Sequence, residues 1–535
     1  MFSRPHRVFQ PIHALARATR AKPRNSHNAH QRRTFINQLP GMTRIHRAQM
    51  GHDLKRVGTL VLLPPLLVAS YITACGILGF VGAQIWLEYF AMRPGRDKDA
   101  IKAAEWGWET EEDWSGGKNG GTDPSLGTLA RIAIRSAWLF NTWAGQMGQQ
   151  NVYSRSKTSS ASTSYIQSAL LGSTDRAHAL AEQSLAWALE YMDQKHPDRP
   201  VPHSLLLRHA DILEHIGTLD TVNGARREVF SVYRELPRGS YERSRLALRL
   251  GSLHLAEGGK RDAIRLWSEA LNVQPSGEGA TYSPAEERLI ADTYLQLSAL
   301  YSTDSRLDQA SEIQEKAWRT IDSFIRPDPL GKHTDDGNAE KSLHALYLKH
   351  RAVVLSIHAA EVNYAQTRNV QSTLSQLEAA TEQAGAVARR LTTNDQDGSV
   401  EKKTAIQSTT RVPAAHLSDA YSESNALQVP ATSLLRDARR AVMQALVLKG
   451  LLLESSAVEG SGSLQSTRMV KAGVAPDPLL PALAAYEKAL EWAGTTLKAA
   501  EALGVPEQEV LHVRMRAEGL QRRIRKGTMM LEQDR

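Results

Sequence analysis

Apolar residues recur at intervals of three and four along most of the chain after residue 120, and alternating β-branched runs are scarce. This spacing places apolar side chains on one face of an α-helix, so we expect the region to be helical throughout. The pattern is sharpest over residues 244–272. Two apolar-periodic segments are separated there by Gly258, and Pro275 follows the second, which predicts a helical hairpin.

The spacing within this hairpin resembles the tetratricopeptide repeat, a helix-turn-helix unit of about 34 residues. Small residues would let its two helices approach closely, and large apolar residues would fill the remaining space. We therefore expect Trp267 to be a core residue. The residues that carry the repeat signature are Leu250, Gly251, Ala263, Trp267, Ala270 and Pro275.

Neighbouring segments match the tetratricopeptide spacing less completely. They supply one further unit before and one after residues 244–272. The predicted fold is an all-α, irregular tetratricopeptide-like solenoid with one N-terminal transmembrane helix. Repeats are expected at 165–391 and C-terminal helical repeats at 431–535. The helices expected to flank the three units are a pair around 181–191 and single helices at 343–365, 371–391, 434–454 and 481–503.

Segments rich in Ser, Thr, Gly and Asp interrupt the helical pattern. The longest are 392–430 and 455–478, and shorter ones occupy 154–164 and 327–339. Because they lack apolar periodicity, we expect them to be disordered inserts.

The N-terminus has the composition of a mitochondrial presequence. The first 52 residues contain nine Arg, one Lys and no acidic residue, with short apolar patches between the charges. Presequences are rich in Arg and poor in acidic residues, whereas a secretory signal would place its apolar core earlier. We assign residues 1–35 to the presequence, with cleavage near Arg33, and 36–56 to a basic segment on the matrix side.

Residues 57–87 carry no charge. As a helix they would extend roughly 46 Å, more than the roughly 30 Å of membrane hydrocarbon. Trp86, Tyr89 and Phe90 are typical of a membrane interface, so we predict a transmembrane helix at 57–90. The excess of basic residues before it favours an N-terminus in the matrix and a C-terminal body in the intermembrane space. Glycines within the span make an oligomer possible.

The basic character of the chain belongs to its N-terminus. Residues 1–56 hold twelve of the 65 Lys and Arg and one of the 57 acidic residues, which leaves 53 basic and 56 acidic residues, a net charge of −3. Nucleic-acid-binding modules usually carry their positive charge in the folded domain. We therefore expect no nucleic-acid partner, but lipid of the inner membrane and other proteins.

Five of the ten tryptophans lie between the predicted span and the repeats, in a Trp- and Gly-rich juxtamembrane segment at 91–153. Asp123 and Pro124 are typical of a helix start. The helix that follows would carry an apolar stripe on one face, with Arg131 and Arg135 on another. The stripe consists of Leu126, Leu129, Ala133, Ala137 and Phe140. Two interpretations stay open: a cap over the open end of the solenoid, or a docking site for a membrane partner. The candidate partner-binding residues are Trp106, Trp108, Trp114, Trp138 and Trp143.

The sequence contains no constellation typical of an enzyme. The HExxH, GxSxG and Walker motifs are absent, Cys75 is the single cysteine, and the 18 histidines are scattered. We therefore predict no catalytic, cofactor-binding or metal-binding residues and no cofactor.

The presequence, the span, the WSGGKNGGTDP segment and the irregular repeats together resemble the fungal tetratricopeptide-containing adaptor of the i-AAA protease in the mitochondrial inner membrane. This resemblance implies a non-catalytic subunit that binds the membrane-embedded ATP-dependent protease and its unfolded substrates in protein quality control.

Two other functions stay open. One is an assembly factor or structural subunit of a respiratory complex. The other is an outer-membrane import receptor, whose repeats grip terminal carboxylates with Lys and Asn side chains. Leu248 and Ser252 stand at the corresponding positions, and neither can make that contact.

Overall fold

The computed structural model divides the chain into two units, Met1–Ala83 and Gln84–Arg535. In the first unit, the described residues from Cys75 onward are helical. Every element discussed below belongs to the second unit. The residues that the structure describes are 75–76, 78–92, 103, 105–108, 114, 121–148, 173–195, 201–277, 281–325, 339–392, 416–461, 479–494, 505 and 507–533.

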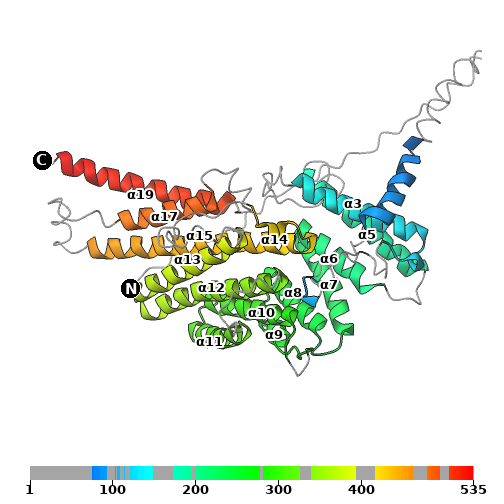
Figure 1. Cartoon of the computed structure of the whole chain (residues 1–535), viewed down its shortest axis with the longest axis horizontal. Helices are drawn as coiled ribbons and strands as arrows, with labels where there is room; N and C mark the ends of the chain where they lie inside the picture. The colour runs from blue at the N-terminus through cyan, green and yellow to red at the C-terminus, as the bar shows by residue number, and fades with distance from the viewer. Residues whose placement is uncertain are drawn as a thin grey trace, which may run out of the picture. The chain divides into compact units, whose positions relative to one another are not determined.

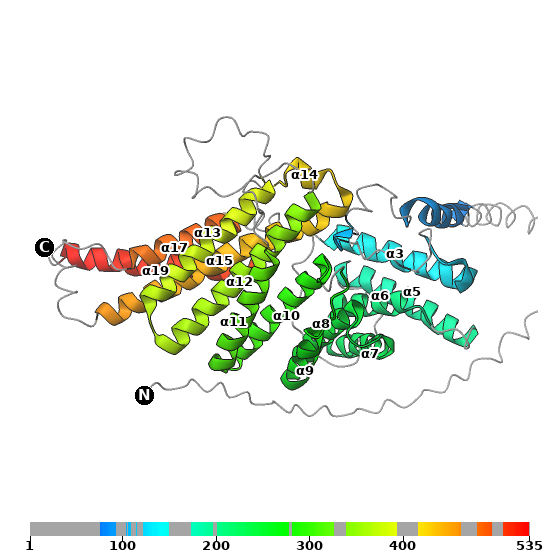
Figure 2. The ribbon, with the colours of Figure 1, turned by 60° about the horizontal axis from the view of Figure 1, so that its bottom comes forward.

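The body consists of helices that pair in chain order as hairpins, and the described residues include no strand. Partners lie side by side in Figure 1 and Figure 2. The hairpins are α6 (His203–Ile216) with α7 (Leu219–Glu235), α8 (Tyr241–Ala256) with α9 (Lys260–Ala270), α10 (Pro284–Thr303) with α11 (Leu307–Phe324), and α12 (Ala339–Thr367) with α13 (Val370–Thr392).

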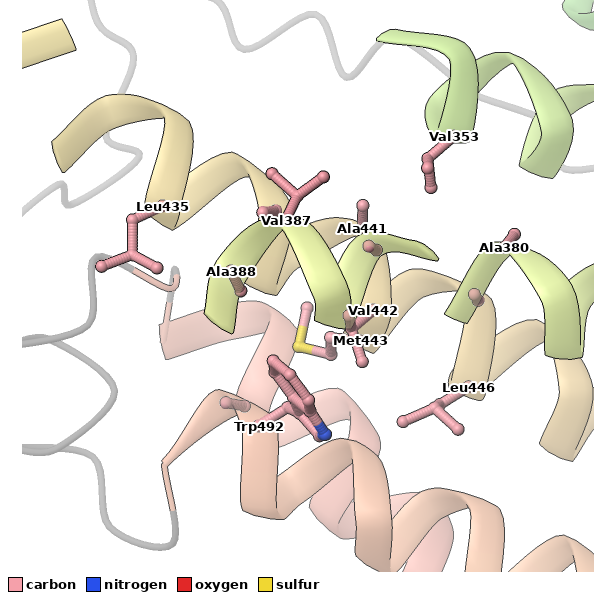
Figure 3. Close-up of a cluster of buried hydrophobic side chains, with 14 of the residues drawn as sticks. Val353, Ala380, Val387, Ala388, Leu435, Ala441, Val442, Met443, Leu446 and Trp492 are labelled. Carbon is pink, nitrogen blue, oxygen red and sulfur yellow. The ribbon is translucent and has the colours of Figure 1, made fainter. Parts of the chain in front are cut away.

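Further helices flank these four hairpins. On the N-terminal side α3 (Thr128–Gly148) packs along α5 (Ser173–Lys195), and their core continues into α6. On the C-terminal side the short α14 (Asp419–Ser422) leads into α15 (Asn425–Ser461), which lies between α13 and α17 (Leu480–Ala493), and α19 (Glu507–Gln533) packs on α17. Figure 3 shows Trp492 of α17 beside Met443 and Leu446 of α15 in this core.

The hairpin of α8 and α9 contains the residues of the predicted repeat signature, and most of them are buried. Leu250, Ala263, Trp267 and Ala270 are completely buried, and the indole Nε1 of Trp267 donates a hydrogen bond of 2.9 Å to the carbonyl oxygen of Leu248. A Cβ atom added to Gly251 would lie 2.2 Å from that Nε1 atom. Glycine is therefore needed there because the indole ring lies against the α8 backbone. Pro275, the last signature residue, follows α9 and is exposed.

Side chains near each helix start explain where the helices begin. Ser283 accepts a hydrogen bond from the backbone of Glu286, whose carboxylate accepts one from the Ser283 amide, and Pro284 occupies the first turn of α10. Thr218 caps α7 with Thr221 in the same reciprocal way. Such caps satisfy the amide groups that have no partner within a helix.

Several predicted boundaries are wrong. Residues 416–430 are not part of a disordered insert, because they form α14 and the start of α15, with Pro430 inside the helix. The loop predicted at 455–478 begins too early, since α15 continues to residue 461. The pair of helices expected around 181–191 is the single helix α5, and α17 ends at residue 493, before Gly494 with φ of 97°.

The predicted start and stripe of α3 also need correction. Asp123 does act as an N-cap, but the helix that it caps is one 3-10 turn, Pro124–Leu126, and α3 begins after Gly127 at φ of 80°. The buried stripe of α3 consists of Ala130, Ala133, Ile134 and Ala137, whereas Leu129 is 49% exposed. Ala133 and Ala137 of the predicted stripe are buried, and short side chains at these positions let α5 pack close to α3.

The predicted transmembrane helix at 57–90 lies largely outside the described residues, which include none of 57–74 and not residue 77. Among the residues that are described, no helix has both the length and the apolar character needed to cross a membrane. The predicted presequence at 1–35 and the basic segment at 36–56 also lie outside the described part of the chain.

A buried histidine links three helices near the N-terminal end of the array. His209 of α6 is 7% exposed, and its Nδ1 atom lies 2.7 Å from a carboxylate oxygen of Glu228 on α7. Its Nε2 atom lies 3.8 Å from Glu182 on α5, an ion-pair distance that is too long for a hydrogen bond. Burial disfavours the charged ring, but the two carboxylates outweigh it and raise the pKa of His209 to about 9.

We expect Gly251→Ala to destabilise the fold by about 1–3 kcal/mol, because the added methyl group pushes the Trp267 ring away from α8. Urea unfolding of the full chain, followed by circular dichroism, measures this. The matched control is Gly519→Ala in α19, where a Cβ atom meets nothing within 4 Å. That change should stabilise its helix by about 0.5–1 kcal/mol. Equal effects of the two changes would contradict close packing at Gly251.

The raised pKa of His209 makes a prediction about pH. The stabilisation by its charged ring is complete below the unfolded pKa of 6.5 and is lost as the pH rises through about 9. Between these values the wild-type chain should lose stability on the order of 1–3 kcal/mol more than His209→Gln does. Unfolding midpoints of both proteins, measured across this window at constant ionic strength, test this. If the stability of the wild type and of His209→Gln changed in parallel with pH, a charged His209 ring in the folded protein would be refuted.

Candidate partner-binding site

The tryptophans expected to form a docking surface lie in separate places. Trp106 and Trp108 pack with the core that includes α12, whereas Trp114 and Trp138 pack with α3, α5 and α6. Trp143 belongs to α3, and its side chain lies outside the described residues. The four described side chains therefore do not form one surface.

Trp108 is held between α10 and α12. Its Nε1 atom donates a hydrogen bond of 3.3 Å to the carbonyl oxygen of Glu340, at the start of α12. The guanidinium carbon of Arg288 on α10 lies 3.8 Å from the centroid of the indole ring, a cation–π distance. The ring of Tyr347 approaches edge-on at 6.0 Å. Only 9% of Trp108 is exposed.

Arg288 fastens the backbone beside this tryptophan. One of its terminal nitrogens donates to the carbonyl oxygens of Trp106 at 2.9 Å and Gly107 at 2.7 Å. The other lies 3.1 Å from Nδ1 of His344, whose Nε2 atom lies 2.8 Å from Glu287. Because a guanidinium can only donate, Nδ1 accepts and Nε2 donates to the carboxylate. One arginine thus joins residues near position 107 to α10 and α12. We name this contact the Arg288 clasp.

The docking interpretation is wrong for two of the tryptophans. Trp108 is buried in the clasp, and Trp114 is 4% exposed, packed with α3, α5 and α6 and 5.5 Å from the guanidinium carbon of Arg208. Neither indole is accessible to a partner. The capping interpretation does not fit Trp106 and Trp108 either, since they lie on the third and fourth hairpins and not at an open end.

Glu88 attaches the segment before the array to α3. One carboxylate oxygen accepts hydrogen bonds from Arg131 at 2.8 Å and from the Thr122 amide at 3.2 Å. The other accepts from the Thr122 hydroxyl at 2.6 Å and lies 2.7 Å from Arg135. Glu88 retains 11% side-chain exposure. Removal of this one carboxylate would leave Arg131 and Arg135 with neutral partners, Thr122 and Gln84, and without the negative charge that they share.

Gly121 completes this contact. Its amide donates to the carbonyl oxygen of Met92 at 2.9 Å, and it has φ of 73°. A Cβ atom there would lie 3.1 Å from the Glu88 carbonyl oxygen. Arg131 and Arg135 lie away from the predicted apolar stripe, and Glu88 was not among the predicted site residues. Two arginines four residues apart on one helix indicate an acidic partner. Nine acidic residues lie between positions 88 and 123, so the sequence does not single out Glu88.

The opposite face of the segment at 84–92 is exposed and aromatic. Ile85, Trp86, Tyr89 and Phe90 are between 52% and 72% exposed, whereas Leu87 is 1% exposed. A helix end that presents four large apolar side chains to solvent needs lipid or another protein to cover them.

Comparisons with known proteins assign no family. No protein-family model matches the chain, and no curated protein matches it. The chain is similar to a signal-transduction ATPase of Pyrococcus horikoshii with a tetratricopeptide repeat sensor, at 12% identity over 64% of this chain and with a TM-score of 0.16. It spans about half (52%) of that protein. It is also similar to human IFIT1, solved as a dimer with PPP-AAAA, at 13% identity over 78% of this chain and 100% of IFIT1, with a TM-score of 0.13.

No group of three or more His, Cys, Asp or Glu side chains that could hold a metal ion occurs among the described residues. Part-buried ion pairs join some of the described helices to one another. The ion pairs of Arg249 with Asp211 and Glu214 and of Arg351 with Asp292 link the first helices of successive hairpins.

We expect Arg288→Met to release residues 106–108 from α10 and α12. The change removes a cation–π contact and leaves two carbonyl oxygens without their donor, a loss of about 1.5–3 kcal/mol in local stability. Hydrogen exchange at the Trp106 and Trp108 amides should accelerate roughly tenfold or more. Arg319→Met on α11, where the side chain is 76% exposed, is the control and should leave this exchange unchanged. Unchanged exchange in Arg288→Met would contradict the clasp.

Proposed function

We propose that the chain is a non-catalytic adaptor of the mitochondrial inner membrane. Its helical hairpins act as a scaffold that binds a membrane AAA protease and the misfolded proteins that the protease degrades. The chain crosses the membrane once, with the N-terminus in the matrix and the hairpins in the intermembrane space.

The observation that carries this proposal is the two-sided segment at 84–92. One side is fastened to α3 through Glu88, and the other presents Trp86, Tyr89 and Phe90 to the surroundings. Exposed Trp and Tyr rings at the end of an apolar stretch are typical of a membrane interface. A rigid link between such a segment and α3 would hold the hairpins at the membrane surface.

The hairpin array supports the scaffold part of the proposal. Its interhelical contacts use small and large residues at repeat-signature positions, and successive hairpins are cross-linked by ion pairs. Such arrays expose long surfaces that bind other proteins. The protease as partner rests on the family resemblance of the sequence.

Ser252 and Leu248 weigh against an import receptor. The Ser252 hydroxyl donates to the Leu248 carbonyl oxygen at 3.2 Å, and the Leu248 side chain packs against neighbouring apolar residues. Neither side chain offers a cation or amide to a terminal carboxylate.

Crosslinking and affinity purification of the full chain from detergent-solubilised mitochondria test the partner. We expect a membrane AAA protease and partly unfolded proteins to be captured. Capture of respiratory-complex subunits without a protease would replace the proposal with the assembly-factor function. Protease treatment of intact and outer-membrane-ruptured mitochondria tests the topology, and digestion of the hairpins in intact mitochondria would refute the inner-membrane location.

We expect Glu88→Ala to reduce capture of the protease several-fold, because the hairpins lose their fixed link to the membrane segment. Glu315→Ala is the control, since that carboxylate is 65% exposed and its ion-pair partner among the described residues is Arg319, one turn along α11. Equal capture by both variants would show that a rigid link is not needed.

A further inference from the structure

An arginine-lined pocket lies at the edge of the array where α7 ends and α8 begins, opposite α9. Its volume is about 550 Å³, within the range of about 300–1,000 Å³ that is usual for ligand sites. Arg234, Arg238, Arg243 and Arg265 line it, with Glu269 as the one carboxylate among the lining residues. It shares no residue with the clasp or with the Glu88 contact.

Arg243 and Glu269 neutralise each other and form the fixed wall of the pocket. Arg243 donates to Glu269 through two nitrogens, at 3.2 and 3.1 Å. Its remaining terminal nitrogen donates to the carbonyl oxygens of Tyr233 at 3.2 Å and Leu236 at 2.9 Å. All three nitrogens of this guanidinium are engaged, so Arg243 organises the site and does not supply its excess charge.

The excess charge comes from the other three arginines. Arg234 and Arg238 are exposed, and no described residue offers either of them a carboxylate. Arg265 lies 3.4 Å from Asp262, but both side chains are more than half exposed, so water screens that pair. The pocket therefore carries uncompensated positive charge on a body whose net charge is negative.

An aromatic surface lies beside these cations. Phe230 is 44% exposed, and its ring stacks on Tyr233 at a centroid distance of 6.1 Å. The guanidinium carbon of Arg234 lies 6.0 Å from the Phe230 centroid, and that of Arg243 lies 4.1 Å from the Tyr233 centroid. The site thus combines an accessible apolar ring with exposed cations.

The rim of the pocket is well fixed. Gly239, in the turn between α7 and α8, has φ of 78°, and its carbonyl oxygen accepts a hydrogen bond of 2.9 Å from the amide of Gln274, beyond the end of α9. This bond ties the turn to α9, so the pocket is formed before any ligand binds. A preformed site loses less conformational entropy on binding.

We propose that this pocket binds an acidic protein segment. Carboxylates of that segment pair with Arg234, Arg238 and Arg265, and an apolar side chain next to them packs on Phe230. A single-stranded nucleic acid fits less well, because such ligands use several exposed aromatic rings along a basic groove. Of the two aromatic residues that line this pocket, Phe230 is exposed and Tyr233 is buried.

Fluorescence anisotropy with the purified full chain in detergent tests this, using a labelled peptide of alternating Glu and Asp around one Phe. We expect saturable binding that weakens as salt rises. The double change Arg234→Ala and Arg238→Ala should weaken it roughly three- to tenfold, since each exposed charge pair contributes only modestly to binding. Phe230→Ala should weaken it as well. Arg319→Ala on α11 is the control and should bind as the wild type does.

Equal binding by the wild type and the double variant would overturn the proposal, as would tighter binding of a single-stranded RNA of equal length. Circular dichroism of each variant separates loss of binding from loss of folding, and Arg234→Lys should retain much of the affinity because it keeps the charge. The assay contains neither membrane nor protease, so its result stands apart from the capture experiment.

Discussion

The close approach of large rings to helix backbone at glycine positions is the constraint on which the rest of the structure depends. In α8, Gly251 faces Trp267 of α9, and a Cβ atom would lie 2.2 Å from the indole. In α15, Gly450 faces Tyr486 of α17, where the distance would be 2.7 Å. Each glycine lets two helix axes come together around a buried ring. Because hairpins contact mainly their neighbours, these close contacts set the distance between paired helices. The surfaces of the array depend on that distance.

Two long-range contacts then attach the N-terminal segments to this array. The Arg288 clasp holds residues 106–108 on α10 and α12, and the Glu88 contact holds residues 84–92 on α3. Both rely on a charged group that is largely withdrawn from water and surrounded by hydrogen-bond partners, so removal of either group is more damaging than loss of a surface ion pair. The aromatic side chains at 85–90 remain outside these contacts, and the proposed membrane attachment uses them.

The arginine pocket is a separate property of the same hairpins. It forms where the turn between α7 and α8 meets the end of α9, so two stretches of the chain, 230–247 and 265–272, build it. Within it, all three guanidinium nitrogens of Arg243 form hydrogen bonds to the protein itself, while Arg234 and Arg238 are exposed and available to a ligand. The charge of Arg243 therefore stabilises the fold, whereas the charges of Arg234 and Arg238 can bind a ligand. A scaffold can thus carry a specific peptide site without an enzyme-like cavity.

Local sequence alone determined the helices and the signature hairpin. The three- and four-residue spacing, Gly258 at the turn and the small residues facing Trp267 all act within about 30 residues, so the pairing of α8 with α9 was predictable. Only the tertiary structure decided the roles of Trp108, Glu88 and Arg234. Trp108 meets an arginine 180 residues away, and Glu88 meets arginines of another helix. A periodic pattern says which face of a helix is apolar, but the partner that covers each face is chosen by distant packing and charge. Leu129 and Ala130 are an example within one helical turn: the larger apolar residue, Leu129, is exposed, and its small neighbour Ala130 is buried.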